Sequence, residues 1–152
     1  MSDVSMRRAT VNDLQAIISL LANDPLGAAR EDPGVPLRVT YLQAFEAIDA
    51  DPNQFLAVAT LDDTVVGTLQ LTFIPNLSRM GAWRAQIEAV RVHECMRDQG
   101  LGRRLFEWAF EQSRLRGCVL VQLTCDRQRP GAHKFYESLG LTATHTGFKM
   151  EL

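Results

Sequence analysis

A glycine-bearing stretch in the second half of the chain has the composition of a phosphate-binding turn. Residues 97 to 102 read Arg-Asp-Gln-Gly-Leu-Gly, between a strand-like run that ends at Val92 and the strongest helical pattern of the chain. The first N–H groups of a helix have no intrahelical partner and carry partial positive charge, so they attract anions. Glycines at 100 and 102 leave no side chain between those N–H groups and a pyrophosphate. We therefore predict a phosphate site in this turn.

The glycine spacing excludes two common nucleotide loops. The chain contains no G-x-x-x-x-G-K-[ST] sequence, which nucleoside triphosphatases use, and Leu105 stands where a dinucleotide fingerprint has its third glycine. A G-x-G pair also occurs in left-handed turns that bind nothing. The assignment therefore depends on what surrounds the turn.

Glu88 is the second residue that could do chemistry, because it interrupts the apolar run Ile87-Glu88-Ala89-Val90. An unpaired buried carboxylate is costly, so an acid in such a strand needs a reason. It could serve as a general base, or it could lie on a solvated face or pair with Arg84 or Arg91.

The cysteines do not form a metal or disulfide pattern. Cys95, Cys118 and Cys125 are odd in number and show no C-x-x-C spacing, so we expect free thiols in a reducing compartment. No paired base is evident for Cys125, and an inert buried thiol is the better interpretation of it. We expect no metal site.

Hydrophobic periodicity predicts the elements that must position these residues. Helices are expected around residues 14–21, 42–48, 101–116 and 132–139, and strands at 6–9, 55–60, 65–74, 85–92, 119–124 and 144–152. Helices alternate with strands in the second half, while the middle is a meander with a tight turn at Asp62-Asp63. This order predicts an α/β fold with a mixed, twisted central sheet flanked by helices, as a single domain over residues 1–152.

Bulk composition narrows the class of protein. The chain has 152 residues, 46% hydrophobic and 22% charged, with a formal net charge of -2. That balance gives no electrostatic case for nucleic acid or a membrane surface as a partner. No apolar run approaches the ~20 residues of a membrane span, and the N-terminus lacks a secretory hydrophobic region, so we expect a cytoplasmic protein.

Two motifs together resemble a known family. The Arg-x-x-Gly-x-Gly turn after a strand, followed by Ala-His-Lys-Phe-Tyr-Glu-Ser-Leu-Gly-Leu at residues 132–141, resembles the GNAT superfamily of acetyl-CoA-dependent N-acetyltransferases. The close match covers residues 87–141. The resemblance implies a GNAT-like fold, acetyl-CoA as cosubstrate, no metal, and acetyl transfer to a primary amine by direct attack in a ternary complex.

The resemblance also implies roles for individual residues. Glu88 matches a general base and Tyr136 a general acid for the departing thiolate, although Tyr136 could instead be a core residue packed beside Phe135. Arg129 stands where relatives often carry an asparagine that contacts the cofactor, so it could reach a phosphate or be a solvated charge. His133 is expected to be structural or on the cofactor side. The residues implied to bind the pantetheine arm and the pyrophosphate are Val90, Arg91, Val92, Arg97, Asp98, Gln99, Gly100, Leu101, Gly102 and Arg103.

The acceptor is the least defined part of the expectation. The N-terminal helices and their loop should form its site, and the acidic residues there could attract an ammonium group or could form a solvated face: Glu31, Asp32, Glu46 and Asp49. The amine could belong to a small molecule or to a peptide. The alternative is a non-catalytic acyl-CoA-binding or sensor module. A homodimer is also expected, because exposed sheet edges and C-terminal strands of this fold often pair.

Overall fold

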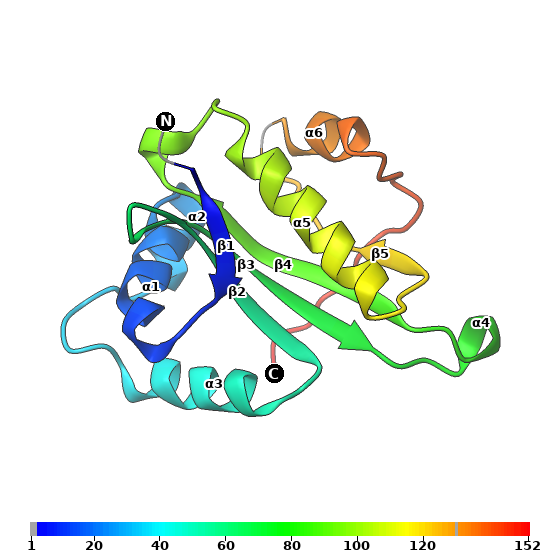
Figure 1. Cartoon of the computed structure of the whole chain (residues 1–152), viewed down its shortest axis with the longest axis horizontal. Coiled ribbons are helices and arrows are strands. Elements are labelled where there is room, and N and C mark those ends of the chain that lie inside the picture. The colour runs from blue at the N-terminus through cyan, green and yellow to red at the C-terminus, as the bar shows by residue number, and fades with distance from the viewer. Residues whose placement is uncertain (1–2, 130) are drawn as a thin grey trace. The chain divides into compact units, whose positions relative to one another are not determined.

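Five of the six predicted strands assemble into one sheet in the order β1-β2-β3-β4-β5. The strands are β1 (Ser5–Arg8), β2 (Gln54–Leu61), β3 (Thr64–Ile74), β4 (Arg84–Val92) and β5 (Leu120–Gln122). The first four pair antiparallel and β5 runs parallel to β4, so the sheet is mixed. The computed structural model, which describes residues 3–129 and 131–152, thus confirms the α/β class (Figure 1).

Contacts divide the chain into two compact units, Met1–Gln122 and Leu123–Leu152. The whole sheet lies in the first unit, with α1 (Leu14–Ala22), α2 (Pro25–Arg30), α3 (Val39–Ala50), α4 (Ser78–Gly81), α5 (Leu101–Leu115) and the short 3-10 turns η1 (Val11–Asp13) and η2 (Glu94–Met96). The second unit contains α6 (Ala132–Ser138). That residues 1–152 form a single domain remains a prediction.

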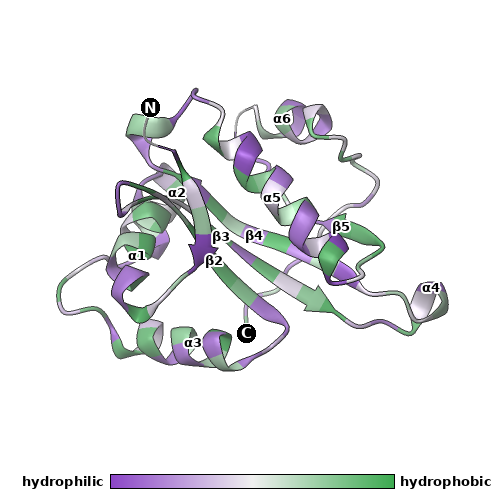
Figure 2. Cartoon of the chain, in the orientation of Figure 1, coloured by the Kyte–Doolittle hydropathy of each residue, from purple (hydrophilic) through white to green (hydrophobic). Residues whose placement is uncertain are grey.

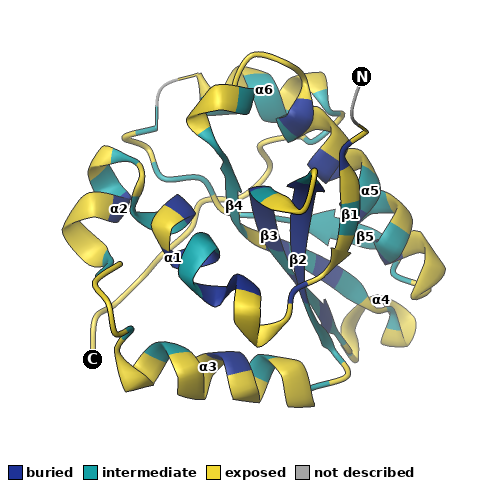
Figure 3. Cartoon of the chain, turned by 60° about the vertical axis from the view of Figure 1, so that its left-hand side comes forward, coloured by how far each residue is buried: buried dark blue, intermediate teal, exposed yellow. Residues whose placement is uncertain are grey.

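Helices cover both faces of the sheet. Leu56 and Val58 of β2 belong to a buried cluster with Ile17 of α1 and Phe45 of α3. Side chains alternate along a strand, so Phe55 lies on the opposite face, where its ring packs against Trp108 of α5, with 5.2 Å between the centroids. Apolar colour runs along β2 and β3 in Figure 2, and the same strands are buried in Figure 3. The sheet is therefore a scaffold between two helical layers.

The turn-forming residues 24–27 predict the end of the first helix, which does end at Ala22, but they also begin a second helix that the sequence pattern did not predict. The chain turns at Asn23 and starts the short helix α2 at Pro25. Asp24 accepts a hydrogen bond from Gly27 N, which caps the new helix, and proline fits the first helical position. Gly27 is required for space, because a Cβ there would lie 1.9 Å from Leu21 O. The same Asp-Pro-x-Gly residues that end one helix thus begin the next.

Strand β4 is interrupted by a bulge. Thr68 of β3 pairs with Arg91 while Gln70 pairs with Glu88, so Leu69 faces both Ala89 and Val90. Ala89 takes the left-handed conformation, with φ of 55°. A bulge of this kind bends the strand and redirects the side chains beyond it. It lies immediately before the residues expected to hold the cofactor.

The last strand of the sequence prediction is not formed. Residues 141–152 are neither helix nor strand, and residues 142–152 are exposed. Phe148, Met150 and Leu152 alternate as a half-buried strand requires, but a strand also needs a backbone partner, and the described residues supply none. The alternation gave the prediction; the missing partner explains why it is wrong.

Candidate cofactor and acceptor site

The predicted phosphate turn lies at the N-terminus of α5, where the sequence placed it. Gly100 is the N-cap with φ of 80°, and Asp98 is also left-handed with φ of 59°. The first backbone hydrogen bond of the helix runs from Arg104 N to Gly100 O at 3.1 Å, so the N–H groups of the preceding residues point out of the helix end. No heavy atom lies within 4 Å of a Cβ built at Gly100. Glycine is therefore required there by the backbone angle rather than by space.

Three side chains hold the turn to its surroundings. Arg97 Nη2 donates to Asn23 O at 3.2 Å, Gln99 Nε2 donates to Cys95 O at 2.6 Å, and Arg104 Nη2 donates to Val4 O at 2.9 Å. The Arg104 guanidinium therefore reaches back to the N-terminal segment. The anion-attracting end of α5 is thus anchored to the end of α1 and to the residue before β1.

Strand β4 brings the residues implied for the pantetheine arm next to this turn. Its pairing with β5 ends at Gln86 and Gln122, so the strand beyond Gln86 continues without a β5 neighbour in the described pairing. Arg91 folds back, with Nη1 donating to Val90 O at 2.8 Å and Nε 3.4 Å from Asp24 Oδ2. The side chain is mostly buried, with 21% of it exposed. Arg91 therefore joins β4 to the start of α2.

Glu88 lies in the same strand but is not buried. It pairs in register with Gln70, on the face where α1 and α3 pack, and it is exposed. The expected burial of Glu88 is therefore wrong, and its carboxylate lies on a solvated face, as the alternative interpretation had it. Its proposed partners are engaged elsewhere: Arg91 contacts Asp24, and Arg84 donates to Gln122 Oε1 at 3.2 Å. An exposed carboxylate beside the bulge can exchange protons with solvent, which a general base requires.

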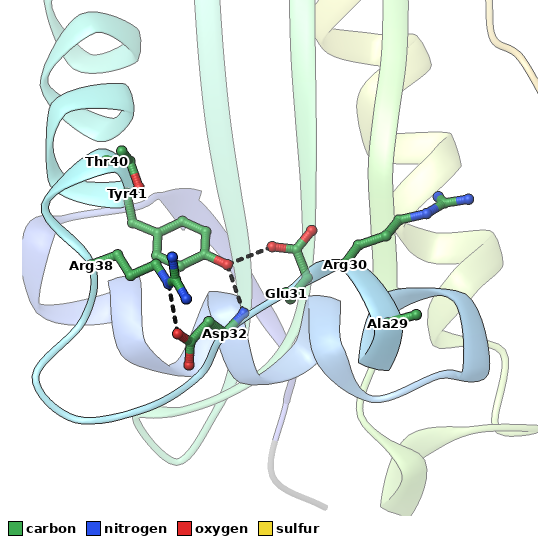
Figure 4. Close-up of a pocket in the computed structure, with 7 residues that line it drawn as sticks. All are labelled: Ala29, Arg30, Glu31, Asp32, Arg38, Thr40 and Tyr41. Atoms are coloured by element: carbon green, nitrogen blue, oxygen red, sulfur yellow. Dashed lines mark hydrogen bonds and ion pairs between the residues drawn. The ribbon is translucent and has the colours of Figure 1, made fainter. Parts of the chain in front are cut away.

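A polar pocket lies at the junction of α2 and α3 (Figure 4). It has a volume of about 560 Å³ and is lined by Ala29, Arg30, Glu31, Asp32, Arg38, Thr40 and Tyr41. Tyr41 Oη donates to Glu31 Oε2 at 2.7 Å and accepts from Asp32 N at 2.9 Å. Burial, reinforced by the Glu31 carboxylate, raises the pKa of the Tyr41 hydroxyl, so the phenol stays protonated and holds Glu31 in place.

The pocket and the cofactor strand are linked through α2. Asp24 holds the start of α2 to Arg91, while Arg30 at its end lines the pocket. Six helical residues span about 9 Å, which is the length of a small organic molecule. Of the acidic residues expected at the acceptor site, Glu31 and Asp32 line this pocket, whereas Glu46 and Asp49 do not.

The remaining predicted residues belong to the second unit. Tyr136 is half-buried in α6, and its ring centroid lies 5.7 Å from that of Phe135. Arg129 N donates to Asp126 O at 3.1 Å, and His133 is exposed. The structure thus brings together Glu88, residues 90–92 and the phosphate turn in one unit, and Tyr136 and Arg129 in the other.

Sequence reasoning missed two arrangements near the turn. Asp24 was identified only as a helix stop, although an Asp-Pro pair is also a typical helix start. The contact between His93 and Cys95 was not predicted. A side chain that caps a 3-10 turn can meet the residue two positions later, so the His-x-Cys spacing was the available signal.

Other site types find no support in the described part of the chain. Residues 3–129 and 131–152 contain no group of three histidine, cysteine, aspartate or glutamate side chains arranged to hold a metal ion. None of the helices described there has both the length and the apolar character to cross a membrane.

Comparison with known proteins identifies a family to which this chain is similar. The family model of the acetyltransferase (GNAT) family matches residues 16–141. An aminoalkylphosphonate N-acetyltransferase from Salmonella typhimurium is 31% identical over 112 residues, covering 74% of this chain and 72% of that protein.

Two solved structures are similar over nearly the whole chain. A transcriptional regulator from Bacillus halodurans C-125 is 48% identical with a TM-score of 0.96, covering 99% of this chain and 100% of that one. A putative acetyltransferase from Agrobacterium tumefaciens is 32% identical with a TM-score of 0.85, covering 97% and 99%.

Proposed function

The chain belongs to the acetyltransferase (GNAT) family and is an acyltransferase, and from that premise we propose that it moves an acetyl group from acetyl-CoA to the primary amine of a small molecule. The observation that carries the proposal is the juxtaposition, in one unit, of an anion-attracting helix end with a bulged strand that carries an accessible carboxylate. The helix end suits the pyrophosphate, and the strand beyond the bulge offers backbone groups to the pantetheine arm.

Different residues of this chain bind acetyl-CoA and transfer the protons. The N–H groups of residues 98–103 bind the pyrophosphate, and the backbone of residues 90–92 orients the thioester, which acetyl-CoA supplies as the acyl donor. Glu88, directly or through water, takes a proton from the ammonium so that the free amine attacks the carbonyl carbon. A C–N bond forms, the C–S bond breaks, and Tyr136 gives its proton to the departing sulfur. The new amide nitrogen releases its second proton to water, from which Tyr136 is reprotonated, and Glu88 returns its proton to solvent. Arg129 contributes charge to a cofactor phosphate.

We assign the acceptor to the pocket between α2 and α3, and its class to small amines that also carry an acidic group. The pocket has carboxylates at Glu31 and Asp32 and guanidinium groups at Arg30 and Arg38, of which Asp32 and Arg38 pair with each other at 2.6 Å. A ligand with charges of both signs can engage these groups. The relative from Salmonella typhimurium is named for aminoalkylphosphonates, which have both groups. Glu31, held by Tyr41, attracts the incoming ammonium group electrostatically, and the amine then extends along α2 toward β4, where Glu88 takes its proton.

The experiment that tests the function is thiol release from acetyl-CoA with matched acceptors. An aminoalkylphosphonate, the amino acid of the same length and the plain alkylamine are compared at equal concentration. We expect thiol release with all three amines. The two acceptors that carry an acidic group should have a kcat/KM higher than that of the alkylamine by about tenfold or more, since a charge-assisted contact contributes about 1.5–3 kcal/mol. No release with any amine contradicts the function; equal kcat/KM values contradict only the acceptor class.

A second function is favoured by one observation. The solved structure that is 48% identical is that of a protein named a transcriptional regulator. A non-catalytic acyl-CoA sensor binds acetyl-CoA in a calorimetric titration but releases no thiol with the acceptor panel, whereas the enzyme does both. A cytoplasmic location and a homodimer remain predictions.

A further inference from the structure

The 3-10 turn η2, between β4 and the phosphate turn, brings a thiol and an imidazole into contact. Cys95 Sγ lies 2.9 Å from His93 Nδ1, and Cys95 is exposed. The two residues are two positions apart, and the turn folds the first side chain over the second. No step of the proposed acetyl transfer uses either side chain.

The hydrogen bonds around the imidazole define its protonation. Cys95 N donates to the same Nδ1 at 3.2 Å. A backbone N–H can only donate, so Nδ1 is an acceptor, the ring proton is on Nε2, and the thiol also donates toward Nδ1. The bond from the Cys95 amide fixes the ring as the N-cap of η2. Nδ1 has a single lone pair, so taking the thiol proton replaces the bond from the Cys95 amide. The 2.9 Å contact places His93 where it can take that proton, and the resulting thiolate is the nucleophilic form of cysteine.

We propose that Cys95 is a thiol–disulfide exchange site for small disulfides, with His93 as its base. His93 Nδ1 takes the thiol proton, and the Cys95 sulfur attacks one sulfur of the incoming disulfide. A new S–S bond joins Cys95 to that sulfur, the original S–S bond breaks, and the departing thiolate takes the proton from His93. The small disulfide is the oxidant and leaves half of itself as a thiol.

The other cysteines provide a contrast within the chain. Cys118 is half-buried, and burial raises the pKa of its thiol, which lowers the thiolate fraction. Cys125 Sγ donates to the carbonyl oxygen of Asp126 at 3.4 Å, and a carbonyl does not take a proton from a thiol. Exchange is therefore selective for Cys95.

Modification at this position reaches the phosphate turn. Gln99 Nε2 donates to Cys95 O at 2.6 Å, and Arg97, the first residue of the phosphate turn, is two residues after Cys95. A mixed disulfide places a bulky group beside this contact and obstructs the approach to the end of α5. This consequence rests on the proposed function, because it concerns coenzyme A binding, whereas the exchange itself does not.

The exchange is tested by incubating the full chain with glutathione disulfide and following the mass gain of one glutathionyl group, with peptide mapping. Variants are His93→Asn, Cys95→Ser and Cys118→Ser. Asparagine keeps a cap acceptor for the Cys95 amide but cannot act as a base. We expect the adduct on Cys95, formation about tenfold or more slower in His93→Asn, and no change in Cys118→Ser. Thermal melting checks that each variant is folded.

Two results overturn the site: an adduct distributed equally over the cysteines, or equal rates with and without His93. The consequence for the cofactor is read separately, by titrating coenzyme A into the modified protein before and after dithiothreitol. Weakened binding that dithiothreitol restores supports the coupling. Unmodified protein that does not bind coenzyme A contradicts the proposed function, while the adduct on Cys95 still supports the exchange site.

Discussion

At the residue scale, Glu88 shows how a sequence signal can suggest a role for a reason that the structure does not bear out. An acid in an apolar strand suggested burial, yet the structure exposes Glu88 on the face where α1 and α3 pack. The carboxylate is therefore accessible to water and to an amine, and its role as a base remains a prediction.

Replacing Glu88 by glutamine tests that role, because glutamine keeps the shape and cannot accept a proton. We expect kcat to fall by about a hundredfold or more, the usual contribution of a positioned base, with acetyl-CoA binding unchanged. Glu111→Gln on α5, where Glu111 pairs with Arg114 at 3.6 Å, is the matched control and should keep full turnover. Tyr136→Phe should also lower kcat. If Glu88→Gln and Tyr136→Phe both turn over at the wild-type rate, the assignments are wrong.

Asp13 gives a prediction about stability and pH. Its side chain is 8% exposed and receives two hydrogen bonds from Arg7, at 2.7 and 2.9 Å, besides one from Thr10 N. The Arg7 hydrogen bonds lower the pKa of the Asp13 carboxyl. A carboxyl whose pKa is lowered by folding stabilises the protein above its unfolded pKa of about 3.9, and this stabilisation is lost as the pH falls through the folded value.

Urea unfolding at about pH 7 and about pH 3 checks this linkage. We expect Asp13→Asn to lower the free energy of unfolding by about 1–3 kcal/mol at the higher pH and by less at the lower pH, where wild-type Asp13 starts to take up a proton. An equal loss at both values shows that the carboxylate charge is not the cause.

The residues of the site differ in how far the sequence could predict them. The glycine turn was located correctly because its chemistry is local: a helix end and a φ that only glycine adopts readily. The His93–Cys95 contact and the Tyr41–Glu31 bond were not found, since they depend on side-chain directions that a spacing does not determine.

At the element scale, α2 links the pocket proposed for the acceptor to β4. Asp24 caps it and pairs with Arg91, and its close approach to α1 depends on Gly27. The sequence prediction missed α2 because its residues are strong turn formers, and only the capping geometry distinguishes a stop from a new start. The final strand, at residues 144–152, was predicted in error. The alternation of its side chains is visible in the local sequence, but whether another strand pairs with it is not.

Gly27→Ala tests the close approach. By helix propensity alone the change should stabilise by about 1 kcal/mol, and the neighbouring Ala28→Gly should destabilise by the same amount. The contact at 1.9 Å with Leu21 O reverses the sign for Gly27. We expect Gly27→Ala to lose about 1–3 kcal/mol in urea unfolding and to raise the KM for the acceptor. A gain in stability would mean that α1 and α2 are not packed as described.

At the scale of the whole molecule, the sheet separates two tasks. The end of α5 and the strand beyond the bulge are suited to the cofactor, while α2, α3 and the loop between them form the pocket proposed for the acceptor. The alternation of strands and helices made the α/β class predictable. The acceptor could not be predicted, because the pocket is made by a short helix and a loop whose shape no periodicity encodes.

The most direct measurement of the central claim is amide hydrogen exchange with and without acetyl-CoA. We expect slower exchange at residues 98–103 and 90–92 when acetyl-CoA is added, with α3 unchanged until an amine acceptor is present. Exchange that stays unchanged at the phosphate turn and along β4, or slows only elsewhere, would mean that acetyl-CoA does not bind at this helix end and strand.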